Sequence, residues 1–406
     1  MRNALNNFQK TIFILLLYGA CFSGFLSDIA LSSGRTMLYV AFDGLIIFLS
    51  LMSLAYLRGR LIWIVLFIFA CIGVNLSYSS NDLLYSLNGV REILILVSIV
   101  IFYNKIFSED NDDVTEEYIE LMKKFAVFFL IAQLPVAFMQ FYKYGPTDYV
   151  GGTFGNKGSG ILTLSVVCMV FFLSHFVRSN TQRVLLYFCL LPLLLNETKL
   201  SFILIPVLIL LIHFQPKLKN IIGGLLAAGL FLYVFNMYYS NEGLDFDNNL
   251  AGIFSKDFLD AYLFGDIYSS EDIPRFTKIV LGWRLAADET RTLLFGVEYG
   301  IFKGGTMVQS SQFGESIQWL VSGTRPYFFF LILQGGLLLM VGLSWMLLHI
   351  NNYFVKNNNK FKAFLLMIFL VILFYNDALR NQGFVVLYFF NVFYANSNQY
   401  NRNLVE

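Results

Sequence analysis

Long stretches without charge constrain the fold of this sequence more than any single motif. Apolar runs recur along the chain, and most approach the ~20 residues that an α-helix needs to cross the hydrocarbon core of a bilayer. Runs of spanning length lie at 11–29, 37–57, 61–78, 90–107, 124–142, 160–178, 199–214, 218–239, 325–349 and 362–376. Two shorter runs, 183–196 and 382–396, bring the expected number to about twelve. The sequence therefore predicts an all-α polytopic membrane protein.

The composition supports this class and excludes others. The chain is 57% hydrophobic and 14% charged, whereas soluble proteins carry about 25% charged residues. Its net charge of +1 gives no basic field for nucleic acid, so we expect no nucleic-acid partner. The four cysteines are far apart and none forms a CxxC pair, so we predict small buried side chains rather than disulfides or zinc ligands. We expect no metal and no cofactor.

One long polar segment, from Tyr239 to Ser322, interrupts the apolar pattern. Lysine and arginine in short loops favour the cytoplasmic side, and their distribution predicts that both termini are cytoplasmic and the polar segment lies outside. The expected organisation is nine spans in 1–239, a large outer loop in 240–322 and three spans in 323–406. Within the loop, short helices are expected at Ser255–Phe264, Pro274–Glu289 and Glu315–Val321.

Basic residues also occur at the outer membrane boundary, where they are disfavoured. They are Arg91, Lys157, Lys199, Arg325 and Arg380. Ionisable residues near a bilayer are costly and tend to mark functional sites. Any one of them could simply extend to the lipid headgroups, but five together predict an anionic ligand, such as a lipid-linked phosphate, at the outer surface.

Two short motifs lie at the same predicted level. The glycine-rich stretch 151–160 contains Asn156 and Lys157 and precedes a predicted helix, whose N-terminus could bind an anion. An ordinary turn explains this stretch equally well. The second motif is the short connection from Asn196 to Ser201. Within it, Glu197 and Lys199 could form an ion pair with each other. Alternatively, Lys199 could contact a phosphate.

The outer loop supplies arginines and carboxylates. Arg275, Arg284 and Arg291 are candidates for phosphate binding because the guanidinium fork fits phosphate oxygens, and Arg284 is favoured over Arg275. A solvated helix face with internal ion pairs is the alternative. The three histidines fall at predicted cytoplasmic ends, so outer acid–base chemistry would rely first on the carboxylates Glu197, Glu298, Asp377 and Asp82.

Four pieces of the sequence, taken in order, resemble a known family. They are Gly152-Thr153-Phe154-Gly155-Asn156, the turn ending in Thr198-Lys199-Leu200-Ser201, the segment Leu293–Gly300, and Ser322–Tyr327 followed by Leu333-Gln334-Gly335-Gly336-Leu337. With the span pattern and the large outer loop, they resemble the O-antigen polymerase and ligase superfamily of bacterial membrane glycosyltransferases of the GT-C type. The pieces cover roughly the middle half of the chain.

The resemblance implies an enzyme of lipopolysaccharide biosynthesis. It would join oligosaccharide repeat units carried on undecaprenyl pyrophosphate, at the periplasmic face of the inner membrane, with inversion at the anomeric carbon and without a metal. Ligases of this family typically carry a histidine at the loop exit, where this chain has Thr324-Arg325-Pro326-Tyr327. The polymerase branch is therefore favoured.

The cations at the outer boundary and the carboxylates of the outer side, taken with this resemblance, predict roles and partners. The expected catalytic residues are Arg284, Glu298 and Glu197, and the expected pyrophosphate-binding residues are Lys157, Lys199, Arg275, Arg291, Arg325, Arg91 and Asn156. The partners would be the lipid-linked donor and acceptor glycans, membrane lipids and a protein that controls chain length. An O-antigen ligase is the runner-up, and a flippase for lipid-linked oligosaccharides is a weaker alternative.

Overall fold

The computed structural model describes most of the chain, with gaps. The described residues are 2–29, 35–79, 83–107, 112–145, 147, 149–156, 158–196, 199–213, 273, 275–302, 312–321, 325–353 and 359–397. Every regular element within them is a helix. The all-α prediction is therefore confirmed for this part of the chain.

The described helices range from 4 to 33 residues. In order they are α1 (Arg2–Ile29), α2 (Arg35–Leu51), α3 (Arg60–Tyr78), α4 (Leu83–Ile106), α5 (Asp112–Tyr144), α6 (Ser159–Ser174), α7 (Asn180–Phe188), α8 (Leu191–Leu195), α9 (Lys199–His213), α12 (Arg275–Ala286), α13 (Thr290–Phe295), α14 (Gln312–Ser316), α15 (Gln318–Val321), α16 (Tyr327–Tyr353), α17 (Asn359–Tyr375) and α18 (Gln382–Tyr394). Short 3₁₀ turns lie at Leu54–Tyr56 (η1), Gly152–Phe154 (η3) and Ala378–Arg380 (η6).

Five of these helices, α1, α3, α4, α5 and α16, are long and apolar enough to cross a membrane. Six shorter apolar segments of 10–17 residues accompany them. This pattern is typical of a multi-pass membrane protein. The expected number of about twelve spans stays a prediction, because the run 218–239 lies outside the described residues.

The run 183–196, which the sequence suggested as a single span, forms two short helices instead. A capping box formed by Ser179 and Gln182 starts α7, which ends at Phe188. Pro192 occupies the first turn of α8, where its missing N–H is tolerated, whereas inside a continuous helix it would remove a hydrogen bond. A turn at Cys189 and Leu190 separates the two helices.

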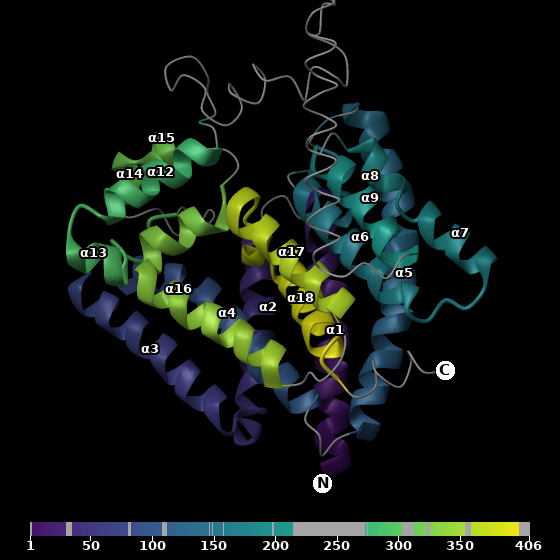
Figure 1. Ribbon diagram of the computed structural model, residues 1–406, viewed down its shortest axis with the longest axis horizontal. Helices are drawn as coiled ribbons and strands as arrows, with labels where there is room; N and C mark the ends of the chain where they lie inside the picture. Colours follow the sequence, from purple (N-terminus) through teal and green to yellow (C-terminus); the bar gives the residue numbers. More distant parts are fainter. Residues whose placement is uncertain are drawn as a thin grey trace, which may run out of the picture.

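The centre of the bundle is formed by α18. All of its residues from Gln382 to Tyr394 are buried, and it contacts α1, α4 and α6. In Figure 1, α17 and α18 lie between α4 and α16 on one side and the group α5–α9 on the other. Aromatic side chains fill this centre, since Phe390 packs against both Tyr103 and Phe172.

The described second half of the predicted outer loop forms four short helices. Those expected at Pro274–Glu289 and Glu315–Val321 correspond to α12 and to α14 with α15. The one expected at Ser255–Phe264 lies outside the described residues. Both α12 and α13 pack on α16, as the upper left of Figure 1 shows. The position of this segment relative to a membrane stays a prediction.

Candidate functional site

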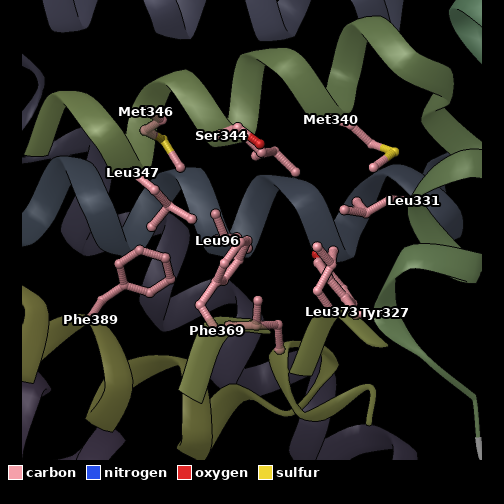
Figure 2. Close-up of a pocket in the computed structure, with 12 residues that line it drawn as sticks. Leu96, Tyr327, Leu331, Met340, Ser344, Met346, Leu347, Phe369, Leu373 and Phe389 are labelled. Atoms are coloured by element: carbon pink, nitrogen blue, oxygen red, sulfur yellow. The ribbon is translucent and has the colours of Figure 1, made fainter. Parts of the chain in front are cut away.

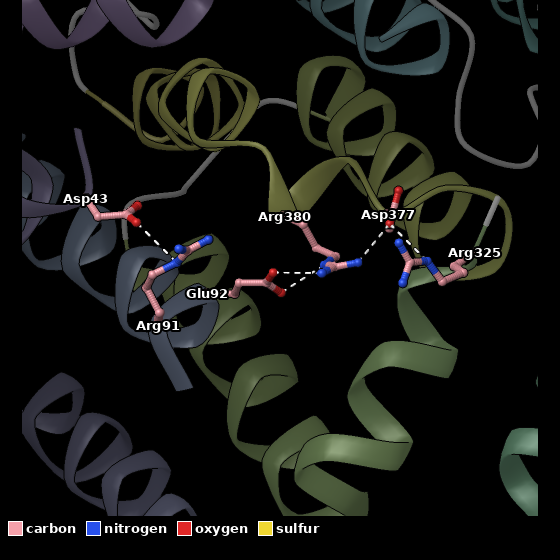
Figure 3. A network of polar contacts seen from close by, with 6 residues as sticks. All are labelled: Asp43, Arg91, Glu92, Arg325, Asp377 and Arg380. Carbon is pink, nitrogen blue, oxygen red and sulfur yellow. Dashed lines mark hydrogen bonds and ion pairs between the residues drawn. The ribbon is translucent and has the colours of Figure 1, made fainter. Parts of the chain in front are cut away.

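Three arginines and three carboxylates form one polar network where α16 begins and α17 turns into α18. They are Arg91, Arg325 and Arg380 with Asp43, Glu92 and Asp377, and Figure 3 shows them in a row. They come from α2, α4, the residues before α16 and the η6 turn. Charged side chains are costly among apolar helices unless they are paired. In this network each arginine lies beside at least one carboxylate, so positive and negative side chains alternate.

Arg380 is the most completely paired member. Its Nε and Nη2 atoms each donate to Glu92 at 2.8 Å, and Nη1 donates to Asp377 at 3.3 Å. This fork is the strong geometry for an arginine–carboxylate pair. Although burial opposes the charge, Glu92 and Asp377 together raise the pKa of Arg380 above its usual value. Arg380 is therefore held as a permanent cation.

Arg325 is much less well paired. Its Nε lies 3.9 Å from Asp377 Oδ2, and no described residue accepts a hydrogen bond from this buried nitrogen. Burial, with the neighbouring charge of Arg380, lowers the pKa of Arg325 to about 10. The side chain is still protonated at neutral pH, but its charge is poorly compensated. An anion bound here would relieve that cost.

The other end of the row is anchored on α2. Arg91 Nε lies 3.1 Å from Oδ2 of the buried Asp43. The other carboxylate oxygen of Asp43, Oδ1, accepts a hydrogen bond from the side-chain amide of Gln382. The sequence indicated Arg91 but not its partner. An acid inside a predicted span, as Asp43 is in 37–57, was the available signal, because such residues tend to be functional or paired. Glu92, beside Arg91, carried the same signal.

The glycine-rich turn is fixed by two glutamines of α5. Gln133 accepts from the N–H of Thr153 at 2.9 Å and donates to its hydroxyl at 2.7 Å, and Gln140 accepts from the N–H of Gly152 at 2.7 Å and donates to its carbonyl at 3.0 Å. The N–H of Asn156 donates to Asp28 at 2.9 Å. These N–H groups are therefore already used within the protein.

This turn nevertheless adjoins the network. A Cβ atom added at Gly160, in the first turn of α6, would lie 2.3 Å from Nδ2 of Asn376, the residue before Asp377. The side chain of Asn156 donates to the hydroxyl of Tyr144 at 3.2 Å. The start of α6 thus faces the same turn that carries Asp377 and Arg380, and the binding role of Asn156 stays a prediction.

The remaining predicted residues fall into three groups. Arg275 stacks on the ring of Tyr375 at 3.9 Å, two residues from Asp377, and so lies near the network. Arg284 is exposed at the end of α12, and Arg291 is exposed near Glu289 and the ring of Tyr78. The third group comprises Lys157 and Glu197, which lie outside the described residues, and Lys199, of which the structure describes only the backbone position at the start of α9.

Glu298 differs from the other candidates because it is buried. It is 7% exposed, and its Oε1 atom has no hydrogen-bond partner among the described residues. It belongs to the segment Leu293–Gly300, which packs against α16. None of the described contacts joins it to Arg325 or Arg380.

A small cavity lies between α4, α16, α17 and α18, next to the network (Figure 2). Its lining includes Tyr327, two residues after Arg325, and Leu379, the neighbour of Arg380, and is otherwise almost entirely apolar. Its volume is about 30 Å³, which is enough for a water molecule but not for a sugar. Among the described residues, no group of three or more His, Cys, Asp or Glu side chains is arranged to hold a metal ion.

No protein-family model, curated protein or solved structure matches this chain. The chemistry of the site itself therefore carries the functional argument. The site combines a partly buried arginine without a close partner for its buried Nε atom, a second arginine paired on both sides beside it, and a helix start facing the same turn. Such an arrangement suits a multiply charged anion.

Proposed function

We propose that this chain is a membrane glycosyltransferase of the O-antigen polymerase type, which joins oligosaccharide repeat units carried on undecaprenyl pyrophosphate. The observation that carries the proposal is the state of Arg325. The network has three charges of each sign, but Arg91 and Arg380 take the short contacts, at 3.1 Å and 2.8 Å, and leave Arg325 a shared carboxylate at 3.9 Å. A diphosphate oxygen would give Arg325 the close partner that the shared carboxylate does not.

In this proposal Arg325 binds the diphosphate of the donor and stabilises it as it leaves. The hydroxyl oxygen of the acceptor glycan forms a bond to the anomeric carbon of the donor, while the bond from that carbon to the diphosphate oxygen breaks. The electron pair of that bond moves onto the diphosphate. Cations that are already fixed in place stabilise this developing charge without reorganisation. Arg275, stacked beside the network, would contact the bound group. Arg284, nine residues further along α12 and exposed, stays a candidate from the sequence alone.

The proton of the attacking hydroxyl requires an acceptor that the substrate can reach. Asp377 is 31% exposed beside Arg325, whereas Glu298 is 7% exposed and lies apart from the arginines. We therefore assign the acceptor role to Asp377 and place Glu298 outside the reacting centre. Glu197 stays a sequence-based alternative.

The proposal includes the location that the resemblance implied: a bacterial inner membrane, cytoplasmic termini and a periplasmic site. The partners would be two lipid-linked glycans, surrounding lipids and a chain-length regulator. A flippase would need cations along an internal path, whereas the described cavity is lined almost entirely by apolar side chains. An O-antigen ligase would use the same donor, and the test below separates it.

The test uses a strain that lacks the gene and is complemented with variants of the full chain. With normal membrane levels, Arg325→Ala should abolish long polysaccharide, because losing one donor to a developing anion costs about 3–4 kcal/mol, or ~10²–10³ in rate. Arg284→Ala should shorten the chains similarly, whereas Arg178→Ala, at an exposed arginine before α7, should not.

Glycan length on gels distinguishes the alternatives. A polymerase defect leaves single repeat units transferred to the lipid A core, a ligase defect transfers none, and a flippase defect leaves the units on the cytoplasmic side. Near-normal chain lengths in Arg325→Ala would refute the role given to the network.

A further inference from the structure

The helix α16 is broken near its middle. Gly336 has φ 65° and ψ −171°, which are not helical values, so the half that begins at Tyr327 ends just before it. Carbonyl groups at the end of a half-helix lose their helical partners and carry partial negative charge. Such carbonyls must find other donors when they are buried.

Two donors from distant segments cover these carbonyls. The N–H of Val297 donates to the carbonyl of Leu333 at 2.7 Å. The side-chain amide of Asn75, in α3, donates to the carbonyls of Gln334 at 3.2 Å, Phe295 at 2.6 Å and Gly296 at 3.3 Å. The amide nitrogen of Asn75 thus faces three carbonyl oxygens, which fixes the orientation of its side chain.

The backbone approach at this point leaves no room for other side chains. A Cβ atom at Gly336 would lie 2.4 Å from the nitrogen of Gly296, and one at Gly296 would lie 2.4 Å from the carbonyl oxygen of Gln334. The segment Leu293–Gly300 is therefore packed directly on the break. Glu298 follows Gly296 by two residues in this segment and is buried.

Three buried acceptor atoms remain without partners around the break. They are Oδ1 of Asn75, Oε1 of Gln334 and Oε1 of Glu298, and no described residue donates to any of them. Their residues are 4%, 1% and 7% exposed. All three atoms are oxygens, and one belongs to a carboxylate. Burying a carboxylate oxygen without a hydrogen-bond donor is costly.

We propose that this region binds one alkali-metal cation, Na⁺ or K⁺, held by Glu298, Asn75 and Gln334. Oxygen ligands suit hard cations, and a single carboxylate balances a single positive charge, whereas a divalent ion would leave an uncompensated charge in the interior. The end of the first half of α16 also carries partial negative charge, which favours a cation nearby. The cation ties the end of the outer-loop segment to the break in α16. This inference is independent of the glycosyltransferase proposal.

The test is thermal unfolding of the purified full-length protein in detergent. Choline chloride is replaced stepwise by NaCl, KCl or LiCl at constant ionic strength. One alkali cation should raise the unfolding midpoint by several degrees in a saturable way, because a ligand that binds only the folded state stabilises it. Glu298→Gln should lose this response, and Glu315→Gln, at an exposed carboxylate of the same loop, should keep it.

Two outcomes would overturn the proposal. One is an unfolding midpoint of the native protein that is the same in choline and in every alkali chloride, and this result decides the matter even if Glu298→Gln does not fold. The other is an undiminished cation response in Glu298→Gln.

Discussion

Arg380 shows how one residue can organise a charged site among apolar helices. It joins Glu92 of α4 to Asp377 of the η6 turn, and its side chain and that of Glu92 are only 15% and 12% exposed. A buried ion pair contributes little net stability by itself, but losing one partner leaves the other charge unpaired. The pair should therefore matter most when only half of it is removed.

This asymmetry gives a prediction at the residue scale. Arg380→Ala should destabilise the protein by about 3–5 kcal/mol because it leaves Glu92 buried without its partner. Adding Glu92→Gln should restore part of that loss. Thermal unfolding of the two single variants and the double variant measures the coupling between the residues. Strictly additive losses would show that the two side chains do not form the pair described here.

At the element scale, the apolar runs predicted helix bounds well where a helix ends at the same place as its apolar run. The run 61–78 corresponds to α3 (Arg60–Tyr78), and 362–376 corresponds closely to α17 (Asn359–Tyr375). The break in α16 could not be predicted in this way. A glycine inside an apolar run is ordinary. Gly336 has to be a glycine because its backbone contacts that of Gly296, which is distant along the chain.

The break gives a prediction with an internal control. Gly336→Ala should destabilise the protein, because a left-handed φ costs a non-glycine residue about 1–2 kcal/mol and the added Cβ would meet backbone atoms at 2.4 Å. Gly73→Ala, in α3 with open space around it, should be neutral or stabilising by up to about 1 kcal/mol. Equal unfolding midpoints for the two variants would contradict this account of the break.

The glycine-rich turn gives a second prediction at this scale. Gln133→Leu leaves the buried N–H and hydroxyl of Thr153 without the partners they have now, which should cost about 1–3 kcal/mol. In a background that carries Thr153→Val, the same change should cost clearly less. The free energy of unfolding, measured for Gln133→Leu in both backgrounds, checks the turn independently of any activity. An equal loss in the two backgrounds would show that Gln133 and Thr153 do not interact.

At the scale of the whole molecule, the sequence indicated basic residues at one boundary, but neither which of them would meet nor how they would be paired. Arg284 and Arg291, also predicted for the site, are exposed instead. Arg91, Arg325 and Arg380 all stand at predicted outer boundaries, and the structure brings them into one network. The partner of Arg380 lies 288 residues away along the chain, so no local pattern indicates it. Of the predicted ring, Lys157 and the Lys199 side chain lie outside the described residues.

The orientation of the molecule is the remaining prediction, and it rests on the distribution of lysine and arginine in short loops. Three native cysteines are buried and Cys189 is partly so, so replacing Cys189 with Ser gives a quiet background for labelling. A membrane-impermeant maleimide added to spheroplasts should modify Asp288→Cys, at an exposed position after α12. It should modify Arg58→Cys, exposed before α3, only after permeabilisation. The opposite pattern would place the arginine network at the cytoplasmic face, where a periplasmic glycan donor cannot reach it, and would exclude the proposed polymerase.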